Sequence, residues 1–268
     1  MTTTTTLDAA ALSATPAAEV RNLNVSFGPA HVLHDINLRV PANTVIGLVG
    51  ESGSGKSTLG KTLVGINRAS SGDVFIAGED FTKMRGRRMR QMRREVQYIP
   101  QDPYSSLSPR RTIGQTLAEA LDPRRGNHTA HHDTIVAALE EVKLDATAIE
   151  KYPHEFSGGQ RQRIAIARAL MLRPRLIIAD EITSALDVSV QAEIIRMLRG
   201  LRGTVDSAML FISHNLAVVQ QVCDDVAVMS NGVIVEQGPV ASVYRNPQHE
   251  YTAELLASVP GAPGFTLD

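Results

Sequence analysis

A glycine- and serine-rich run near the start of the chain has the sequence Gly50-Glu51-Ser52-Gly53-Ser54-Gly55-Lys56-Ser57-Thr58. It follows an apolar segment of buried-strand length at 45–49, and a helix is expected to follow it over 57–67. Glycines let backbone N–H groups converge on an anion, and a helix N-terminus adds partial positive charge. Lys56 can reach the β- and γ-phosphates, and the hydroxyl of Ser57 can bind Mg²⁺. The run, here called the phosphate loop, predicts a nucleoside-triphosphate site rather than an ordinary Gly/Ser turn.

The composition limits the classes of protein to which the chain can belong. Its 268 residues suffice for one large or two small domains with a proper core. A formal charge of -1 provides no global field that would attract nucleic acid. The single cysteine, Cys223, excludes an internal disulfide framework and fits a reducing, intracellular setting. No apolar stretch approaches the roughly twenty residues that span a bilayer, so work at a membrane would require docking onto a partner that spans it.

The segments before the phosphate loop predict a tail and a small sheet. Residues 1–17 begin as a Thr/Ala tract without periodicity or a basic start, which indicates a disordered tail rather than a secretion signal. Weak alternation over 19–40, broken by Gly28-Pro29, predicts two or three strands of an antiparallel lobe. Phe27 ends the first of these strands, where a half-buried sheet aromatic is the simplest interpretation. A further strand is expected over 72–78.

Two polar clusters in the middle of the chain have ordinary explanations. A basic run could be a nucleic-acid patch, but it lacks interleaved aromatic residues and the net charge is balanced, so a solvated amphipathic helix is favoured. Its basic residues are Lys83, Arg85, Arg87, Arg88, Arg90, Arg93 and Arg94. His128, His131 and His132 lack a cysteine or carboxylate framework for a metal, which favours a polar helix start. Helices are expected over 111–121 and 129–144, with a turn between them.

A second helix start resembles an anion site. A strand over 96–100 is expected to run into a loop at Gln101. Farther along, Ser157-Gly158-Gly159-Gln160 opens a helical pattern over 160–172, and Ser157 suits its N-cap. The N–H groups there form a second anion-binding end. One phosphate chain seldom needs two such ends, unless two copies of the protein share the nucleotide.

Carboxylates and a histidine follow two apolar strands. The run 176–179 is typical of a central parallel strand, and it ends in Asp180-Glu181, where ligands bind in open α/β sheets. Asp180 can hold Mg²⁺ through its water shell, and Glu181 can accept a proton from the water that attacks the γ-phosphate. A strand over 209–213 ends at His214, which can donate to the γ-phosphate. A hairpin around Asn231-Gly232 and a helix over 248–257 complete the chain.

Taken in order, these motifs resemble the nucleotide-binding subunit of an ATP-binding-cassette (ABC) transporter, over about residues 18–260. The matching motifs are the phosphate loop, Gln101, the signature Ser157–Gln160, the strand ending Asp180-Glu181, the loop 184–187 and His214. The resemblance implies an α/β fold with a P-loop NTPase (RecA-like) core and a small antiparallel β subdomain. It also implies an inserted α-helical signature subdomain at about 102–172 and a tail at 246–268.

The resemblance further implies a role for each matching residue. Phe27 would stack on adenine, and Gln101 would contact Mg²⁺ and the attacking water. The signature residues Ser157, Gly158, Gly159 and Gln160 would close over ATP held by the opposite protomer, with Asp187 at the seam. The nucleotide cradle would comprise Gly50, Glu51, Ser52, Gly53, Ser54, Gly55, Lys56, Ser57 and Thr58. Catalysis would depend on Glu181, His214, Gln101 and Lys56, and Mg²⁺ would be bound by Ser57, Gln101 and Asp180.

Three segments narrow the resemblance to the oligopeptide/dipeptide importer branch. They are 101–110, the signature with its continuation 160–163, and the ending 246–256. Glu250 replaces an expected proline in that ending, Ile182 replaces the proline after Asp-Glu, and Asn215 replaces the Asp after the histidine. None of these departures removes a reacting group. Import of a nickel chelate or another small solute stays open, as do a soluble cassette ATPase outside transport and a P-loop kinase.

The importer resemblance also implies partners and a location. A second ATPase subunit, either the same chain or a sibling, would complete the ATP sites. Two transmembrane permease subunits would dock near Gln101 and Tyr104, and an extracytoplasmic solute-binding protein would act indirectly. No nucleic acid is expected among the partners. The protein would lie peripherally on the cytoplasmic face of the inner membrane.

Overall fold

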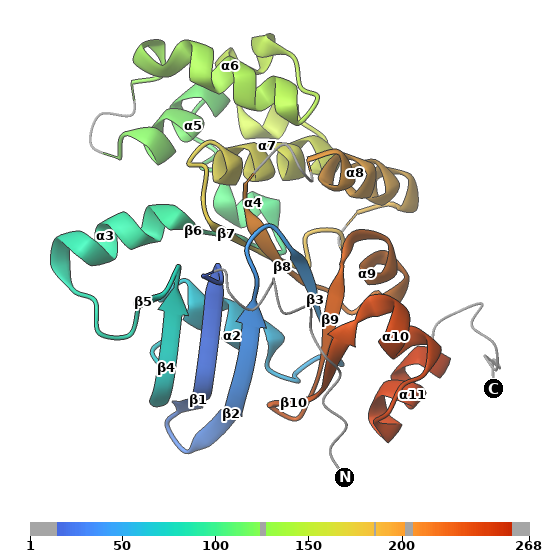
Figure 1. Cartoon of the computed structure of the whole chain (residues 1–268). Helices are drawn as coiled ribbons and strands as arrows, with labels where there is room; N and C mark the ends of the chain where they lie inside the picture. The colour runs from blue at the N-terminus through green and yellow to red at the C-terminus, as the bar shows by residue number, and fades with distance from the viewer. Residues whose placement is uncertain (1–14, 124–126, 185, 202–205, 259–268) are drawn as a thin grey trace.

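The computed structural model of the chain contains two β-sheets and several helices (Figure 1), and it describes residues 15–123, 127–184, 186–201 and 206–258. Most of the predicted tail and the end of the chain lie outside these ranges, as do 124–126 in the predicted turn and residue 185 in the loop 184–187. The side chains of Tyr104 and Ser105 also lie outside the description.

A four-stranded antiparallel sheet forms the small lobe that the sequence predicts. Its strand order is β2-β1-β4-β5. Residues that face the core alternate with exposed ones along β1, and its pairing with β2 shifts register around Asn22, where φ is +46°. The strands are β1 (Ala18–Phe27), β2 (Ala30–Val40), β4 (Ser71–Ile76) and β5 (Glu79–Asp80).

A six-stranded sheet of order β10-β9-β3-β8-β7-β6 forms the centre of the molecule. Strands β9, β3, β8, β7 and β6 run parallel, so their carboxyl ends lie along one edge, and β10 is antiparallel at the border. β3 and β7 are buried at every position, as expected for strands covered on both faces. The strands are β3 (Val45–Val49), β6 (Val96–Ile99), β7 (Leu176–Asp180), β8 (Ala208–Ile212), β9 (Asp225–Ser230) and β10 (Val233–Pro239).

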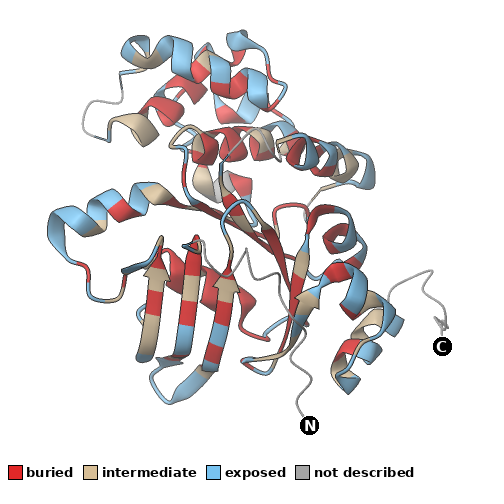
Figure 2. Ribbon diagram, viewed as in Figure 1, coloured by how far each residue is buried: buried red, intermediate tan, exposed pale blue. Residues whose placement is uncertain are grey.

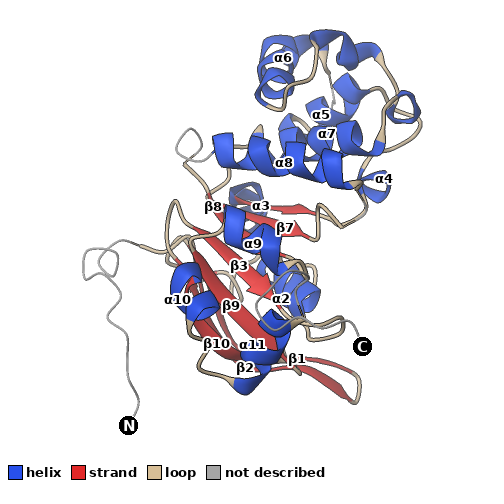
Figure 3. Cartoon of the chain, turned by 90° about the vertical axis from the view of Figure 1, so that its right-hand side faces the viewer, coloured by secondary structure: helices blue, strands red, loops and turns tan. Residues whose placement is uncertain are grey.

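Helices cover both faces of the central sheet, and one group of them extends beyond one end of the sheet (Figures 1 and 3). The α-helices are α2 (Lys56–Leu63), α3 (Gly86–Glu95), α4 (Pro103–Ser106), α5 (Ile113–Leu121), α6 (His132–Glu141), α7 (Gly158–Leu170), α8 (Val188–Leu201), α9 (Leu216–Val222), α10 (Val240–Arg245) and α11 (Glu250–Ala257). Short 3-10 helices are η1 (Thr129–His131), η2 (Ala146–Glu150) and η3 (Pro153–Glu155). No described helix is both long enough and apolar enough to cross a bilayer.

The central sheet separates two hydrophobic clusters, and its strands are largely buried (red in Figure 2). Alternate residues of each strand contribute to opposite clusters: Ile177 faces one and Ile178 the other. One cluster joins the sheet to α2 and the antiparallel sheet, while the other joins it to α5, α6, α7, α8 and α9. The carboxyl ends of the parallel strands therefore lie between two packed layers.

Several element boundaries differ from the predictions for local reasons. The helix after the phosphate loop ends at Leu63 rather than near 67, because Gly65 adopts a φ of +71°. The expected loop after Gln101 contains the short helix α4, whose first residue is Pro103, a residue preorganised for that position. The predicted helix over 129–144 is divided into η1 and α6, and the histidines lie at its start as predicted.

The basic run forms a solvated amphipathic helix, as predicted. Met92 on α3 is buried in the core, and Met89 packs partly against it. The arginines of the helix are exposed, and Arg88 pairs with Glu79 on β5.

Candidate nucleotide-binding site

The phosphate loop connects β3 to α2 and depends on glycine at defined points. Gly50, Gly53 and Gly55 have φ values of +149°, +82° and +105°. A Cβ at Gly50 would lie 2.0 Å from the carbonyl oxygen of Met229. Gly55 is the N-cap of α2 and has no side chain, so no side-chain cap satisfies the first-turn N–H groups. The helix N-terminus can therefore donate to an anion.

The ammonium group of Lys56 is held inside this loop. Its Nζ donates to the carbonyl oxygens of Gly50 at 2.8 Å and Glu51 at 2.6 Å, and to Ser54 Oγ at 3.3 Å. The residue is only 4% exposed. Burial lowers the pKa of Lys56, while the carboxylates of Glu181 and Asp180 oppose this shift. The cation is thus fixed between the loop carbonyls and the carboxylates at the sheet edge.

Asp180, at the end of β7, accepts two hydroxyl hydrogen bonds. Ser57 donates to its Oδ1 at 3.1 Å, and Tyr98 on the neighbouring β6 donates to its Oδ2 at 2.6 Å. Burial, together with the adjacent carboxylate, raises the pKa of Tyr98 far above its usual value, so this hydroxyl stays a donor. The adjacent Ser57 hydroxyl and Asp180 carboxylate are hard oxygen donors, a set that suits Mg²⁺.

Glu181 and His214 meet at the ends of two adjacent strands. Glu181 adopts a φ of +48°, and its N–H donates to the carbonyl of Ile212 at 2.9 Å. Its Oε2 lies 3.4 Å from Nδ1 of His214, an ion pair when the imidazole is protonated. The Glu181 side chain is 18% exposed and that of His214 is 58% exposed, so water can reach both.

Gln101 is connected to this pair through Ser184. Its Nε2 donates to Ser184 Oγ at 3.1 Å, and Ser184 Oγ donates to the carbonyl of Glu181 at 2.9 Å. A change in the position of Gln101 can therefore reach the backbone of Glu181 through two hydrogen bonds.

The signature lies at the start of α7. Ser157 is the N-cap, as predicted, and it forms a capping box with Gln160: Gln160 N–H donates to Ser157 Oγ, and Ser157 N–H donates to Gln160 Oε1. Both residues are exposed. Within the described residues, no hydrogen bond or ion pair joins the signature to the phosphate loop of the same chain.

Phe27 ends β1, as predicted, and pairs with Ala30 at the tip of the β1–β2 hairpin. The residue is 49% exposed, so its ring is accessible to a ligand. The structure therefore brings together Lys56, Ser57, Asp180, Glu181, His214 and Gln101. In the described part of the chain, no hydrogen bond or ion pair joins Phe27 or the signature to them.

Sequence reasoning missed Tyr98 and also Tyr251, whose Oη accepts a hydrogen bond from the N–H of Glu51 at 3.0 Å. Tyr98 could have been found from its place on a strand beside β7, whereas no local pattern points to Tyr251.

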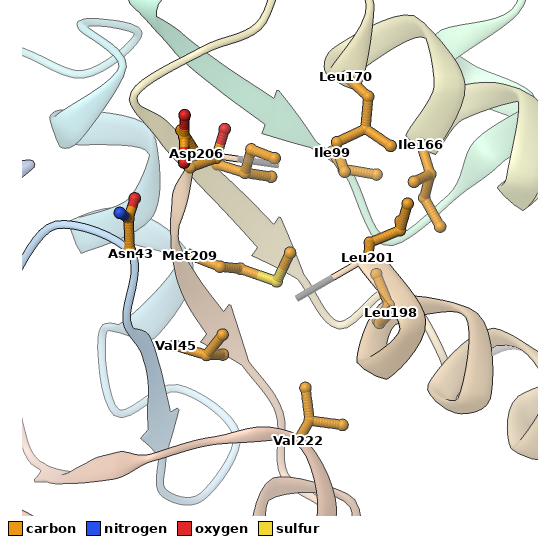
Figure 4. Close-up of a pocket in the computed structure, with 12 residues that line it drawn as sticks. Asn43, Val45, Ile99, Ile166, Leu170, Leu198, Leu201, Asp206, Met209 and Val222 are labelled. Atoms are coloured by element: carbon orange, nitrogen blue, oxygen red, sulfur yellow. The ribbon is translucent and has the colours of Figure 1, made fainter. Parts of the chain in front are cut away.

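A separate cavity of about 120 Å³ lies on the helical side of the sheet and contains none of these residues (Figure 4). Its mostly apolar lining includes Val45, Ile99, Ile166, Leu198 and Met209. It belongs to the core between β6, β8 and the helices α7 and α8, so we assign it no role in the candidate site.

Comparison with known families decides the classification. Residues 33–184, which include the phosphate loop, Gln101, the signature and Asp180-Glu181, match the family model described as ABC transporter. The chain belongs to this family.

Curated ABC proteins resemble the chain over most of its length. A Brucella ovis protein, provisionally named a peptide import ATP-binding protein, is 44% identical over 254 residues, which are 93% of this chain and 80% of that protein. The glutathione import ATP-binding protein of Salmonella paratyphi A is 46% identical over 87% of this chain and 37% of its own length. A peptidoglycan transport ATP-binding protein of Agrobacterium fabrum is 49% identical over 84% of this chain and 41% of its own length.

Solved ABC structures share the fold. A subunit of an ABC transporter complex from Clostridium perfringens superposes with a TM-score of 0.77 at 26% identity, over 86% of this chain and 91% of that one. An ATP-bound bacterial ABC exporter gives a TM-score of 0.74 at 26% identity, over 90% of this chain and 42% of the exporter. The predicted fold class, the predicted ATPase class and the resemblance to the peptide-importer branch are confirmed.

Proposed function

We propose that the chain is the ATP-hydrolysing subunit of an ABC importer that takes up di- or oligopeptides through membrane-spanning permease subunits. The observation that carries the proposal is the convergence of Lys56, the Ser57–Asp180 pair and the Glu181–His214 pair at one sheet edge. A phosphate cradle, a pair of oxygen donors and an accessible base are the parts that phosphoryl transfer to water requires. The names of the curated relatives support the assignment to import.

The residues of the site divide the work of hydrolysis. Phosphate-loop N–H groups and Lys56 bind the β- and γ-phosphates, and the exposed ring of Phe27 stacks on adenine. Ser57, Asp180 and Gln101 would hold Mg²⁺, and a bound Mg²⁺ would neutralise charge on the phosphate oxygens. Glu181 accepts the proton of the attacking water, and His214 orients Glu181 and donates to the γ-phosphate.

Two such subunits complete each site. The exposed N-terminus of α7 has no bond to the phosphate loop of its own chain among the described residues, and it is free to close over ATP on another subunit. The partner is a second copy or a sibling ATPase, and Asp187 lies at the seam between them. ATP then acts through its higher affinity for the closed pair, and hydrolysis resets the pair.

The proposal places the subunit at the cytoplasmic face of the inner membrane. The permease subunits contact the surface around Gln101 and Tyr104, so that their movement reaches Glu181 through Ser184. An extracytoplasmic solute-binding protein delivers the cargo. The helical signature subdomain at about 102–172 is proposed as part of the ABC domain, and the tail at 246–268 as the importer-type part of the chain.

Purification of the full chain from its native membranes tests this function. The expected result is co-purification with two permease subunits and ATP hydrolysis that increases when a peptide-loaded binding protein is added. Stimulation by a nickel chelate or another small solute, but not by peptides, would replace peptide as the cargo. Recovery of the chain without any membrane subunit, at full ATPase activity, would contradict the importer role and favour a soluble cassette ATPase.

A further inference from the structure

Tyr251 connects the C-terminal helix to the phosphate loop. It lies on α11, in the ending that resembles the peptide-importer branch and outside the segment 33–184 that matches the family model. Its Oη accepts a hydrogen bond from the N–H of Glu51 at 3.0 Å, although the two residues are 200 positions apart. The ring is partly buried and packs against the main hydrophobic cluster, so the hydroxyl is held at a fixed place.

The start of α11 is itself fixed to the central sheet. The carboxylate of Glu236 on β10 accepts hydrogen bonds from the N–H groups of Gln248 at 2.9 Å and His249 at 3.0 Å. His249 then caps the helix, because its Nδ1 accepts from the N–H of Tyr251 at 3.2 Å. The position of the Tyr251 ring is therefore defined by β10 rather than by a free C-terminal segment.

One peptide group of the phosphate loop lies between Tyr251 and Lys56. The carbonyl oxygen of Gly50 accepts from Lys56 Nζ, and the N–H of the same planar Gly50–Glu51 peptide donates to Tyr251. Gly50 has a φ of +149°, and because it has no Cβ, no side chain of its own restricts rotation of the following peptide. The bond to Tyr251 removes this freedom and so fixes the acceptor that holds the ammonium group.

We propose that Tyr251 is a positioning residue for ATP: its hydroxyl fixes the Gly50–Glu51 peptide and, through it, the ammonium group of Lys56. This inference rests on the proposed function, because it requires the phosphate loop to be the ATP site. In this proposal the importer-type ending of the chain positions the phosphate loop for ATP rather than contacting the permease.

The test compares the full-length wild type with Tyr251→Phe and with the matched control Tyr244→Phe. Tyr244, on the neighbouring α10, donates its hydroxyl to the carbonyl of Leu216 at 2.8 Å, so the control also removes one tyrosine–backbone bond. We expect Tyr251→Phe to weaken binding of a non-hydrolysable ATP analogue about three- to tenfold, and Tyr244→Phe to leave it within about twofold. Unchanged affinity in Tyr251→Phe, or an equal loss in both variants, would overturn the proposal.

Amide hydrogen exchange gives a readout that general destabilisation would not reproduce. In the wild type the Glu51 N–H should be protected, and in Tyr251→Phe that protection should be lost while the Leu59 N–H, bonded to Gly55 at 3.0 Å in α2, keeps its own. An unprotected Glu51 N–H in the wild type would refute the bond without any variant.

Binding of the analogue to Lys56→Ala distinguishes failure of the phosphate-loop site from failure of the proposed role of Tyr251. If Lys56→Ala binds the analogue normally, the phosphate-loop site itself is wrong. If Lys56→Ala binds poorly and Tyr251→Phe binds normally, only the inference about Tyr251 fails.

Discussion

Glu181 shows how much of the proposed chemistry depends on single residues. Its φ of +48° lies in the left-handed region, which costs on the order of 1 kcal/mol for a residue with a Cβ. The hydrogen bond from its N–H to Ile212 and the bond from Ser184 to its carbonyl hold that conformation. The result is a carboxylate that projects from the end of β7 toward His214.

Replacing this carboxylate by an amide tests its role as the base. Glu181→Gln keeps the shape of the side chain but cannot accept the proton of water, so we expect ATP hydrolysis to fall by about 10²- to 10⁴-fold. The affinity for ATP should stay unchanged, because the phosphate loop is untouched. Phosphate-release kinetics and equilibrium binding measure the two quantities, and hydrolysis at the wild-type rate would remove Glu181 from the mechanism.

A comparison of Tyr98→Phe with Tyr244→Phe tests how much the hydrogen bond to Asp180 contributes to stability. The hydroxyl of Tyr98 donates to the carboxylate of Asp180, and that of Tyr244 donates to a neutral carbonyl. A hydrogen bond to a charged group contributes about 1.5–3 kcal/mol, against about 0.5–1.5 kcal/mol for a neutral one. Tyr98→Phe should therefore lower the free energy of unfolding more than Tyr244→Phe does in urea titrations. The reverse order would show that the Asp180 bond adds little.

At the scale of elements, the phosphate loop is held by three neighbours. Its Gly50 packs against the carbonyl of Met229 on β9, the carbonyl of Ser54 accepts from the N–H of Gly232 in the β9–β10 turn, and Tyr251 binds the Glu51 N–H. Residues from the last third of the chain thus contact the phosphate loop, which lies in its first quarter, and fix its conformation.

Two glycine substitutions separate backbone strain from lack of space in this loop. A Cβ at Gly50 would meet the Met229 carbonyl at 2.0 Å, whereas nothing lies within 4 Å of a Cβ at Gly53, although both have positive φ. We expect Gly50→Ala to lower the free energy of unfolding by at least about 2 kcal/mol more than Gly53→Ala. Urea titration of the two variants measures the difference. Equal losses would mean that only the backbone angle matters.

The elements themselves were largely predictable from the sequence. A short, fully apolar run such as 176–179 is typical of a central strand, and Ser157 followed by Gln160 is a local capping signal, so the sequence predicts both elements. The short helix α4 was missed because its four residues give no period to detect. Contacts between distant segments carry no local signal, and the bond from the N–H of Glu51 to Tyr251 spans 200 positions.

At the scale of the whole molecule, the chain holds two helix ends that are proposed to bind phosphate and that are not bonded to each other among the described residues. The phosphate loop leads from the central sheet into the N-terminus of α2, and the signature forms the N-terminus of α7 in the helical layer (Figure 1). A single chain would leave the second end unused. In the proposed pair of chains both ends are used, with the cradle from one molecule and the lid from the other.

The oligomeric state of Glu181→Gln tests this claim most directly. The mass of the full-length variant should be measured in solution with and without Mg²⁺ and ATP, and a Glu181→Gln, Lys56→Ala double variant serves as the control that cannot bind nucleotide. We predict a shift from monomer to dimer when ATP is added, and no shift in the control. A Glu181→Gln protein that remains monomeric when saturated with ATP, alone and together with its co-purifying partners, would contradict the account.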